Sequence, residues 1–414
     1  MESSSENKNR KMEYAPEVLA PAGDMECLKA AVAYGADAVY LAGKTFGMRA
    51  APQNFDDDQL RQAAEYCHSR NVNIYVTCNT LPRSGELARL PAFLELCQDI
   101  GIDALIAADL GVISMAKKYA PDVSLHISTQ LGVVNYATAV SLYEMGASRV
   151  VTARELSLAE IADIRRNVPK ELEIEAFVHG AMCMSVSGRC LLSNYMTGRD
   201  ANRGGCAQPC RWEYDLVERN RPDKTYSIQQ DGEGSYIFNA RDLNMISHIP
   251  QLAAAGVSSL KIEGRAKSAY YVASTVSAYR RAVDFHMEHP GEALPKDILE
   301  ETEKISHREY STGFYFGEEP GQNTKSGGYI RDYEVVAVCL GRENGMVKLK
   351  QRNRFFKGAA ADVLQPSGKN ISLALDEIYN SDMEEISVAP HAEMIVYLKT
   401  DLEVETGAYF RIEI

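Results

Sequence analysis

Over its first two thirds, the chain alternates short apolar runs with longer amphipathic segments. Eight apolar runs have the length and β-branched content of strands: EVLAPAG, DAVYLAG, VNIYVTCN, DALIAAD, VSLHIST, SRVVTAR, LEIEAFVHG and VSSLKIEG. The gaps between them hold, at least in part, helix-like segments such as MECLKAAVAYG and DDDQLRQAAEYCHSR. Eight alternating units favour an α/β fold of the TIM-like (β/α)8 barrel class. A doubly wound open sheet is the alternative, because alternation alone does not prove that the sheet closes.

One interval breaks this rhythm. About 75 residues separate the seventh run, which ends near Gly180, from the eighth, which starts near Val257, and this is far longer than an ordinary strand-to-helix loop. We place a Cys-rich insertion at 180–256, in which EYDLVE and SYIFNARDL are predicted strands and HIPQLAAAG is a predicted helix. Barrel enzymes carry their chemistry at the carboxyl ends of the strands, so the insertion leaves the face where a site is expected.

Composition changes divide the chain further. Residues 1–14 form a polar tail, residues 15–316 the barrel, and residues 317–328, GEEPGQNTKSGG, a linker. A helix over 266–289 is expected to end the barrel. Residues 329–414 are predicted to form a small β-barrel domain from the runs YEVVAVCLG, GMVKLKQRN, EMIVYLK and YFRIEI. Asn344-Gly345 supplies the hairpin turn between the first two of these strands.

Charge and hydropathy restrict the compartment and the partners. The hydrophobic share of 45% and charged share of 24% are those of a globular protein. No apolar run is long enough to span a membrane and the start lacks a secretory apolar segment, so we expect a cytoplasmic protein. The net charge of -13 opposes nonspecific attraction to nucleic acid. We therefore expect no DNA partner, and any RNA contact must come from local basic surface.

Four of the nine cysteines gather in the insertion with the spacing C-x6-C-x15-C-x3-C: Cys183, Cys190, Cys206 and Cys210. The other five are scattered among apolar neighbours and are predicted to be buried. Four thiolates can hold either an iron-sulfur cluster or Zn²⁺. Zinc ligands usually come in two tight pairs, and only the last two cysteines are that close, whereas a larger cluster tolerates a longer glycine-rich loop. Spacing alone leaves a cluster, zinc and a coincidence of buried cysteines open.

The same stretch is basic. From His179 to Trp212 it holds four arginines and one aspartate, a net +3. These arginines can neutralise a cluster of thiolates, or Arg199 and Arg203 among them can face a phosphate or carboxylate ligand. Both interpretations stay open at this point.

Polar residues also follow the predicted strands. They are Asp24, Asn79, Asp109, Gln130, Arg154, Glu155, Lys261, Glu263 and Arg265, together with the strand-end histidines His126 and His179. Asp24 and Asp109 precede helical segments and are predicted to be helix caps. Alternation places Lys261, Glu263 and Arg265 on one face of the eighth strand, where buried charges need partners. Each histidine can be either a packed core residue or part of a site.

In the C-terminal domain, VKLKQRNRFFK places cations at alternate positions: Lys348, Lys350, Arg352 and Arg354. As a strand, this segment aligns them on one face, which we call the basic ridge. A solvated edge strand protected against aggregation has the same pattern. The functional interpretation is an RNA-binding ridge that tracks phosphates, with Phe355 and Phe356 available to stack or to pack.

The insertion also carries a family resemblance. Glu175-Ala-Phe177-Val-His-Gly180-Ala-Met-Cys183, followed by Gly188-Arg-Cys190-Leu-Leu-Ser193, resembles the signature of the collagenase-like peptidase family U32. LAPAGD, HISTQ and KIEGR resemble the same family, so the similarity spans nearly the whole chain. The well-understood members are iron-sulfur proteins needed to hydroxylate C5 of a pyrimidine in RNA, and they depend on prephenate. The barrel with one short β domain is more similar to the branch that makes 5-hydroxyuridine at the wobble position of tRNA.

The resemblance implies a 4Fe-4S cluster on Cys183, Cys190, Cys206 and Cys210, with zinc second. Prephenate is a dicarboxylate, so Arg49, Arg154, Lys261 and Arg265 are the candidate cations for it. We assign catalytic roles to His179, Lys261, Glu263 and Arg265. We assign substrate contacts to Arg49, Asn79, His126, Gln130, Arg154, Arg199 and Arg203.

Two alternatives remain from the sequence. The family name suggests a metal-dependent or unassigned peptidase, although neither H-E-x-x-H nor G-x-S-x-G occurs in the chain. A non-catalytic role beside a related family member as partner subunit is the other.

Overall fold

The computed structural model describes residues 14–47, 54–182, 190, 192–201, 205–212, 230–231, 234–235, 241–317 and 329–414. Arg49, Cys183, Arg203 and the predicted strand at 213–218 lie outside these ranges, as do residues 1–13 of the predicted tail and 318–328 of the predicted linker.

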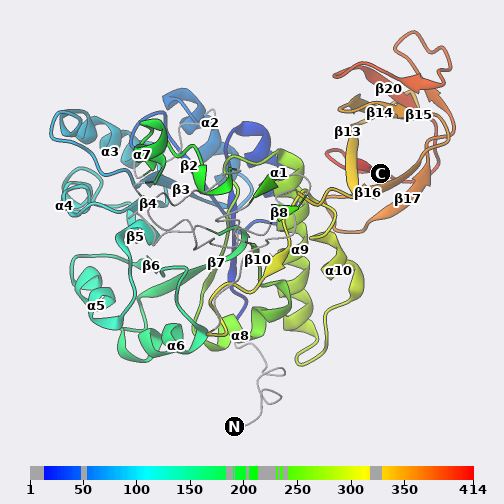
Figure 1. Ribbon diagram of the computed structural model, residues 1–414. Coiled ribbons are helices and arrows are strands. Elements are labelled where there is room, and N and C mark those ends of the chain that lie inside the picture. The colour runs from blue at the N-terminus through cyan, green and yellow to red at the C-terminus, as the bar shows by residue number, and fades with distance from the viewer. Residues whose placement is uncertain are drawn as a thin grey trace, which may run out of the picture.

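Among the described residues, eight parallel strands close into a barrel (Figure 1). They are β1 (Glu17–Pro21), β2 (Ala38–Ala42), β3 (Asn73–Cys78), β4 (Ala104–Ala107), β5 (Ser124–Ile127), β6 (Arg149–Val151), β7 (Glu173–Ala181) and β11 (Ser259–Ile262). Each strand pairs in parallel with the next, and β11 pairs with both β7 and β1. The closing pair decides between the two predicted architectures: the barrel is confirmed and the open sheet was wrong.

Amphipathic helices surround the barrel. They are α1 (Met25–Ala33), α2 (Asp57–His68), α3 (Leu90–Asp99), α4 (Leu110–Tyr119), α5 (Tyr136–Glu144), α6 (Leu158–Asn167), α8 (Ile249–Ala254), α9 (Ala269–Glu288) and α10 (Lys296–Glu301). Single 3-10 turns lie at Leu87–Arg89, Thr129–Leu131 and Ile246–His248. The predicted caps are confirmed, because Asp24 accepts from the Cys27 amide and Asp109 from the Val112 amide. In the described part of the chain, no helix is both long and apolar enough to cross a bilayer.

The insertion adds its own short elements to the barrel. These are α7 (Leu192–Thr197), the 3-10 turn η4 (Pro209–Arg211), β8 (Gln230–Asp231), β9 (Gly234–Ser235) and β10 (Asp242–Asn244). β10 runs antiparallel to the end of β7, and β12 (Tyr310–Ser311) joins its other edge. The two outer strands extend the sheet beside the point where β7 leads into the cysteine-rich segment. The predicted helix HIPQLAAAG corresponds to α8.

Residues 329–414 form an antiparallel half-barrel of short strands. They are β13 (Tyr333–Glu343), β14 (Met346–Gln351), β15 (Phe355–Phe356), β16 (Ala360–Leu364), β17 (Ile371–Ala374), β18 (Ile378–Tyr379), β19 (Val388–Ala389), β20 (Ile395–Leu398) and β21 (Tyr409–Glu413). The predicted hairpin turn is confirmed, because Asn344 and Gly345 have φ values of 53° and 81°. The strand predicted for the basic ridge is shorter than expected, since β14 ends before Arg352.

A buried ion pair docks this domain on the barrel, beside α9 and α10 (Figure 1). Arg411 of β21 donates two hydrogen bonds to Glu301 of α10, at 2.6 and 2.7 Å, and both side chains are 0% exposed. Asp362 accepts a further bond from Arg411 at 3.0 Å. The Tyr34 hydroxyl, at the end of α1, donates to carbonyls of the C-terminal domain. A satisfied, water-excluded pair of this kind fixes orientation because breaking it leaves buried charges without partners.

Candidate functional site

Polar side chains converge at the carboxyl ends of the barrel strands, which we call the mouth. Arg265 follows β11 and donates to the Thr77 hydroxyl of β3 at 3.0 Å. Asn79 follows β3, and its amide group lies 3.5 Å from the Ser128 hydroxyl after β5. The Gln130 backbone amide donates to the same hydroxyl at 3.3 Å. Loops far apart in sequence therefore meet here, as predicted from the strand ends.

Arg154 connects the end of β6 to the end of β7. Its guanidinium donates to the Ala181 carbonyl at 2.8 Å and lies 3.8 Å from the centre of the Phe177 ring. Ala181 is the last residue of β7, two positions before Cys183. The structure thus places a cation where the barrel leads into the cysteine-rich segment. Arg199, also predicted as a substrate contact, is exposed on that segment just after α7.

Lys261 and Glu263 are both buried at this end of the barrel. Lys261 is 5% exposed, lies 2.5 Å from Glu175 of β7, and has its ammonium 4.4 Å from the Tyr40 ring centre. Glu263 is 7% exposed, and its backbone amide donates to the His179 carbonyl at 2.9 Å. The expectation that the charges of this strand need partners is met for Lys261 by Glu175 and for Arg265 by Thr77.

The Lys261 pair continues into a chain of charges inside the barrel. Arg149, at the start of β6, contacts Glu175 at 3.2 Å, Glu17 at 2.6 Å and Glu173 at 2.7 Å. Burial is the largest influence on Lys261 and lowers the pKa of its ammonium, while Glu175 opposes that change. Sequence reasoning missed Glu17, Arg149 and Glu175. Their signal was available, because all three occupy inward-facing alternate positions near strand starts, where a charge requires a partner.

The two strand-end histidines are buried and neutral. His126 is 4% exposed, packs edge-on against the Tyr75 ring at 4.7 Å, and its pKa lies well below the usual value because of burial and the nearby Arg149. His179 is 1% exposed among the rings of Tyr271, Tyr279 and Tyr310. Burial lowers its pKa to about 3. Both are therefore hydrogen-bonding or packing groups rather than cations near neutral pH.

His179 gives a prediction about acid stability. The unfolded histidine binds a proton near pH 6.5, whereas the folded one does so only near pH 3, so this residue favours unfolding progressively as the pH falls across that window. We expect His179→Phe to reduce the pH dependence of the unfolding free energy by up to about 1.4 kcal/mol per pH unit there. Chemical denaturation of both proteins at several pH values measures this, and parallel profiles would contradict it.

Backbone amides bond to side chains within the described part of the cysteine-rich segment. Its helix α7 packs against η4, and the Ser193 hydroxyl accepts from the Ala207 amide at 3.0 Å. The Gln208 amide donates to the Cys206 sulfur at 3.3 Å. Cys206 is exposed, while Cys190 and Cys210 are half-buried. Cys210 thus lies in η4 and Cys206 just before it, next to α7.

The five scattered cysteines differ in burial from the described cysteines of the insertion. Cys27, Cys67, Cys78, Cys97 and Cys339 are all buried, as predicted. Burial raises the pKa of the Cys67 and Cys97 thiols to about 12, so they stay protonated. Cys190, Cys206 and Cys210 are at least partly accessible, and thiolates are soft donors that suit a metal or cluster. Among the described residues, which exclude Cys183, no three His, Cys, Asp or Glu side chains are placed to hold a metal ion. The four-cysteine ligand set stays a prediction.

The basic ridge is paired with carboxylates. Lys348 lies 2.8 Å from Glu343, Lys350 contacts Glu393, and Arg352 contacts Glu26 of the barrel. Arg354 is exposed beyond the strand. Phe355 is buried, whereas Phe356 is 57% exposed and remains available for stacking. Exposed pairs of this kind contribute little to stability, so a phosphate can replace the carboxylates at small cost. An RNA-binding role for the ridge stays a prediction.

A closed eight-stranded barrel with a polar mouth and an insertion that leaves its carboxyl face defines a barrel enzyme architecture. Comparison with known families assigns the chain within this class. The profile of Peptidase family U32 matches residues 23–325, and that of the Peptidase family U32 C-terminal domain matches residues 331–411. The chain belongs to peptidase family U32.

The proteins similar to this chain include RNA-modifying proteins and a collagenase. The chain is 36% identical to the tRNA hydroxylation protein P1 of Bacillus subtilis over 96% of its own length and 95% of the relative's. It is 33% identical to a 23S rRNA 5-hydroxycytidine synthase of Escherichia coli, over 70% of this chain and 44% of that one. It is also 34% identical to a collagenase of Porphyromonas gingivalis, over 74% of this chain and 75% of that one.

Proposed function

We propose that this protein is an RNA-modifying hydroxylase that acts on tRNA, forming 5-hydroxyuridine at the wobble position with prephenate as co-substrate. Similarity over nearly the full length to a tRNA hydroxylation protein supports the RNA substrate. The observation that carries the proposal in the structure is the arrangement of the mouth, where Arg154 is bonded to the last residue of β7, just before the cysteine-rich segment, and Arg265 is bonded to Thr77 of β3. A cytoplasmic location belongs to the same proposal, because tRNA is the substrate.

The mouth divides into groups with different tasks. Arg154 and Arg265 are guanidinium groups suited to the two carboxylates of prephenate. Lys261 is engaged with Glu175, so its role is to hold the barrel interior beneath the mouth in place rather than to bind the co-substrate directly. Neutral His179 of β7 and buried Glu263, which follows β11, are neighbours at the mouth, where they can orient a bound pyrimidine by hydrogen bonding.

Cys183, Cys190, Cys206 and Cys210 are the proposed ligands of a 4Fe-4S cluster, and zinc is the second choice. A bound cluster would supply one-electron chemistry at the mouth. The four glycines of this stretch allow the chain to follow a large ligand closely. The protein's own part is to hold the segment on α7 and η4 and to place Arg154 beside it.

Mass spectrometry of tRNA from cells with and without the gene tests the function. We expect 5-hydroxyuridine to disappear on deletion and to return with the wild-type gene. Blocking prephenate synthesis should give the same loss. A related family member could replace the deleted protein, so the strain must lack every family member before complementation. Unchanged 5-hydroxyuridine in that strain would reject the proposal. If 5-hydroxyuridine returns only when a second family member is supplied as well, the protein has a non-catalytic role beside that partner instead. Cleavage of gelatin by purified protein would favour the peptidase.

A further inference from the structure

A pocket beside the mouth lies between the two domains. It has a volume of about 440 Å³, within the range of small-ligand sites. The barrel contributes the turn after β1, the turn after β11 and the start of α9, and the C-terminal domain contributes β13 and the residues after β14. The two barrel turns lie at the carboxyl ends of their strands, so this interdomain pocket opens on the same face as the cysteine-rich segment.

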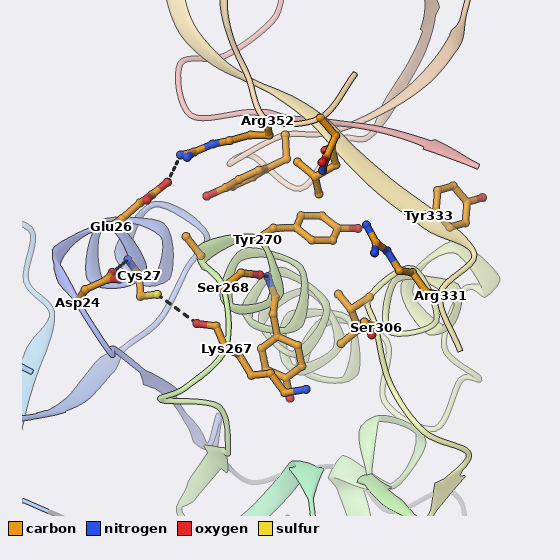
Figure 2. Close-up of a pocket in the computed structure, with 16 residues that line it drawn as sticks. Asp24, Glu26, Cys27, Lys267, Ser268, Tyr270, Ser306, Arg331, Tyr333 and Arg352 are labelled. Carbon is orange, nitrogen blue, oxygen red and sulfur yellow. Dashed lines mark hydrogen bonds and ion pairs between the residues drawn. The ribbon is translucent and has the colours of Figure 1, made fainter. Parts of the chain in front are cut away.

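Three cations line the interdomain pocket, and Figure 2 shows Arg352 and Arg331 on two sides of the Tyr270 ring. Arg352 comes from the basic ridge and contacts Glu26, so the ridge reaches the pocket. Arg331 lies 2.8 Å from Glu334, and both side chains are accessible to water. Lys267 is half-buried, and in the described part of the chain no carboxylate lies within ion-pair distance of it. Two aromatic rings lie near its ammonium, that of Tyr271 at 5.1 Å and that of Tyr329 at 4.9 Å.

The remaining lining favours an anion that carries a ring. Tyr270, Tyr333 and Tyr409 contribute aromatic surface, and Ser306 and Asn353 contribute polar groups. The two acids of the lining are already occupied, because Asp24 caps α1 and Glu26 pairs with Arg352. Cations next to aromatic rings are the combination that holds single-stranded nucleic acid, with phosphate on the cations and the base on a ring. A duplex is far wider than a pocket of this size, so any nucleic acid that enters the pocket does so as an unpaired nucleotide.

The pocket is joined to the mouth by one short turn. Arg265 points from this turn toward Thr77 in the mouth, and Lys267, two residues later, lines the pocket. The Lys267 amide donates to the Gly264 carbonyl at 2.8 Å, which keeps the turn tight. A nucleotide in the pocket would therefore lie only a few nucleotides along the strand from one that is bound at the mouth.

We propose that the interdomain pocket binds one unpaired nucleotide of the substrate RNA, close to the modified one, through Lys267, Arg331 and Arg352. This inference rests on the proposed function for the identity of the RNA. It adds a recognition site that both domains build, and it explains why the C-terminal domain is docked firmly against α10. The basic ridge would then lead the flanking phosphates away from the pocket.

Equilibrium binding of tRNA to the full-length protein at several salt concentrations tests the pocket. We expect Lys267→Ala with Arg331→Ala to weaken tRNA binding about 10-fold or more and to reduce the slope of log affinity against log salt by about 0.7 per lost phosphate contact. Tyr333→Ala should weaken binding by about 5-fold, and Tyr333→Phe should restore it, because the ring is what stacks. Equal melting temperatures would establish that these variants are folded.

The chain offers a matched control. Arg166 pairs with Asp163 at 2.7 Å with the same three-residue spacing as Arg331 and Glu334, and exposed Lys170 follows close by, at the opposite end of the barrel. Arg166→Ala with Lys170→Ala should leave affinity and slope unchanged. If the pocket variant behaves like this control, the proposal is wrong. Binding of free uridine monophosphate as tight as that of tRNA would also overturn it, since the ligand would then be a free nucleotide.

The outcomes separate this proposal from the proposed function. Unchanged tRNA binding by the pocket variant, together with loss of 5-hydroxyuridine on gene deletion, would reject the pocket and keep the function. Weakened RNA binding by the pocket variant, with 5-hydroxyuridine unaffected by deletion, would keep the pocket and reject the function.

Discussion

Replacing Cys190 or Cys210 by serine is expected to abolish tRNA hydroxylation in complemented cells, by roughly 100-fold or more, and to remove most of the iron from anaerobically purified protein. Serine is nearly isosteric but is a hard oxygen donor, so it cannot replace a soft thiolate ligand. Wild-type protein should be brown and carry about four irons. The measurements are tRNA mass spectrometry together with iron and sulfide analysis of the same preparations.

Cys67→Ala is the matched control, because this buried thiol lies in α2 and is kept protonated by burial. It should leave iron content and hydroxylation at wild-type levels, with only a modest loss of stability from the missing sulfur. Full iron content in both serine variants would disprove the four-cysteine ligand set. A single zinc ion in colourless wild-type protein would select the second choice of metal.

Glu175→Gln is expected to cost about 3–5 kcal/mol of unfolding free energy, the largest stability effect we anticipate in the barrel. Glu175 is 0% exposed and compensates both Lys261 at 2.5 Å and Arg149 at 3.2 Å. The amide keeps the shape of the side chain but leaves the Lys261 ammonium buried without a counter-charge. Chemical denaturation of the purified variant measures the loss.

A second substitution tests whether the loss of unfolding free energy comes from the uncompensated charge or from changed packing. Lys261→Met in the Glu175→Gln background removes the uncompensated charge, and we expect it to recover more than half of the lost stability. Arg149 keeps Glu17 and Glu173 as partners in both proteins. If the double variant is no more stable than Glu175→Gln alone, the ion pair is not the source of the effect. Hydroxylation by the double variant then measures whether Lys261 has a role beyond this pairing.

The regular part of the barrel could be predicted because its signal is local. Seven of the eight apolar runs contain the strand that the structure shows, the seventh run misses only the last residue of β7, and Asp24 and Asp109 cap helices as their positions indicate. In the C-terminal domain, strands of two residues such as β15 and β19 escaped prediction, since so short a segment has no measurable alternation. The basic ridge was predicted too long, because alternation continues past Gln351 although the ladder with β20 ends there.

The candidate site was only partly predictable, for a different reason. Residues at strand ends could be found because a parallel barrel brings all carboxyl ends to one face. The partners of Lys261 and Arg149 depend on which inward positions of distant strands reach the same level, and this register is a property of the closed barrel rather than of any segment. The interdomain pocket depends on how Arg411 and Glu301 dock two domains, and no local pattern encodes that contact.

The Arg411–Glu301 pair has a consequence for how such chains can diverge. Because this buried contact sets the spacing between the two domains, the length of the connecting segment 318–328 does not set it. Insertions or deletions there should be nearly neutral in evolution, whereas the arginine and the glutamate can change only together. Variation among natural sequences should therefore concentrate in the connection and spare the pair.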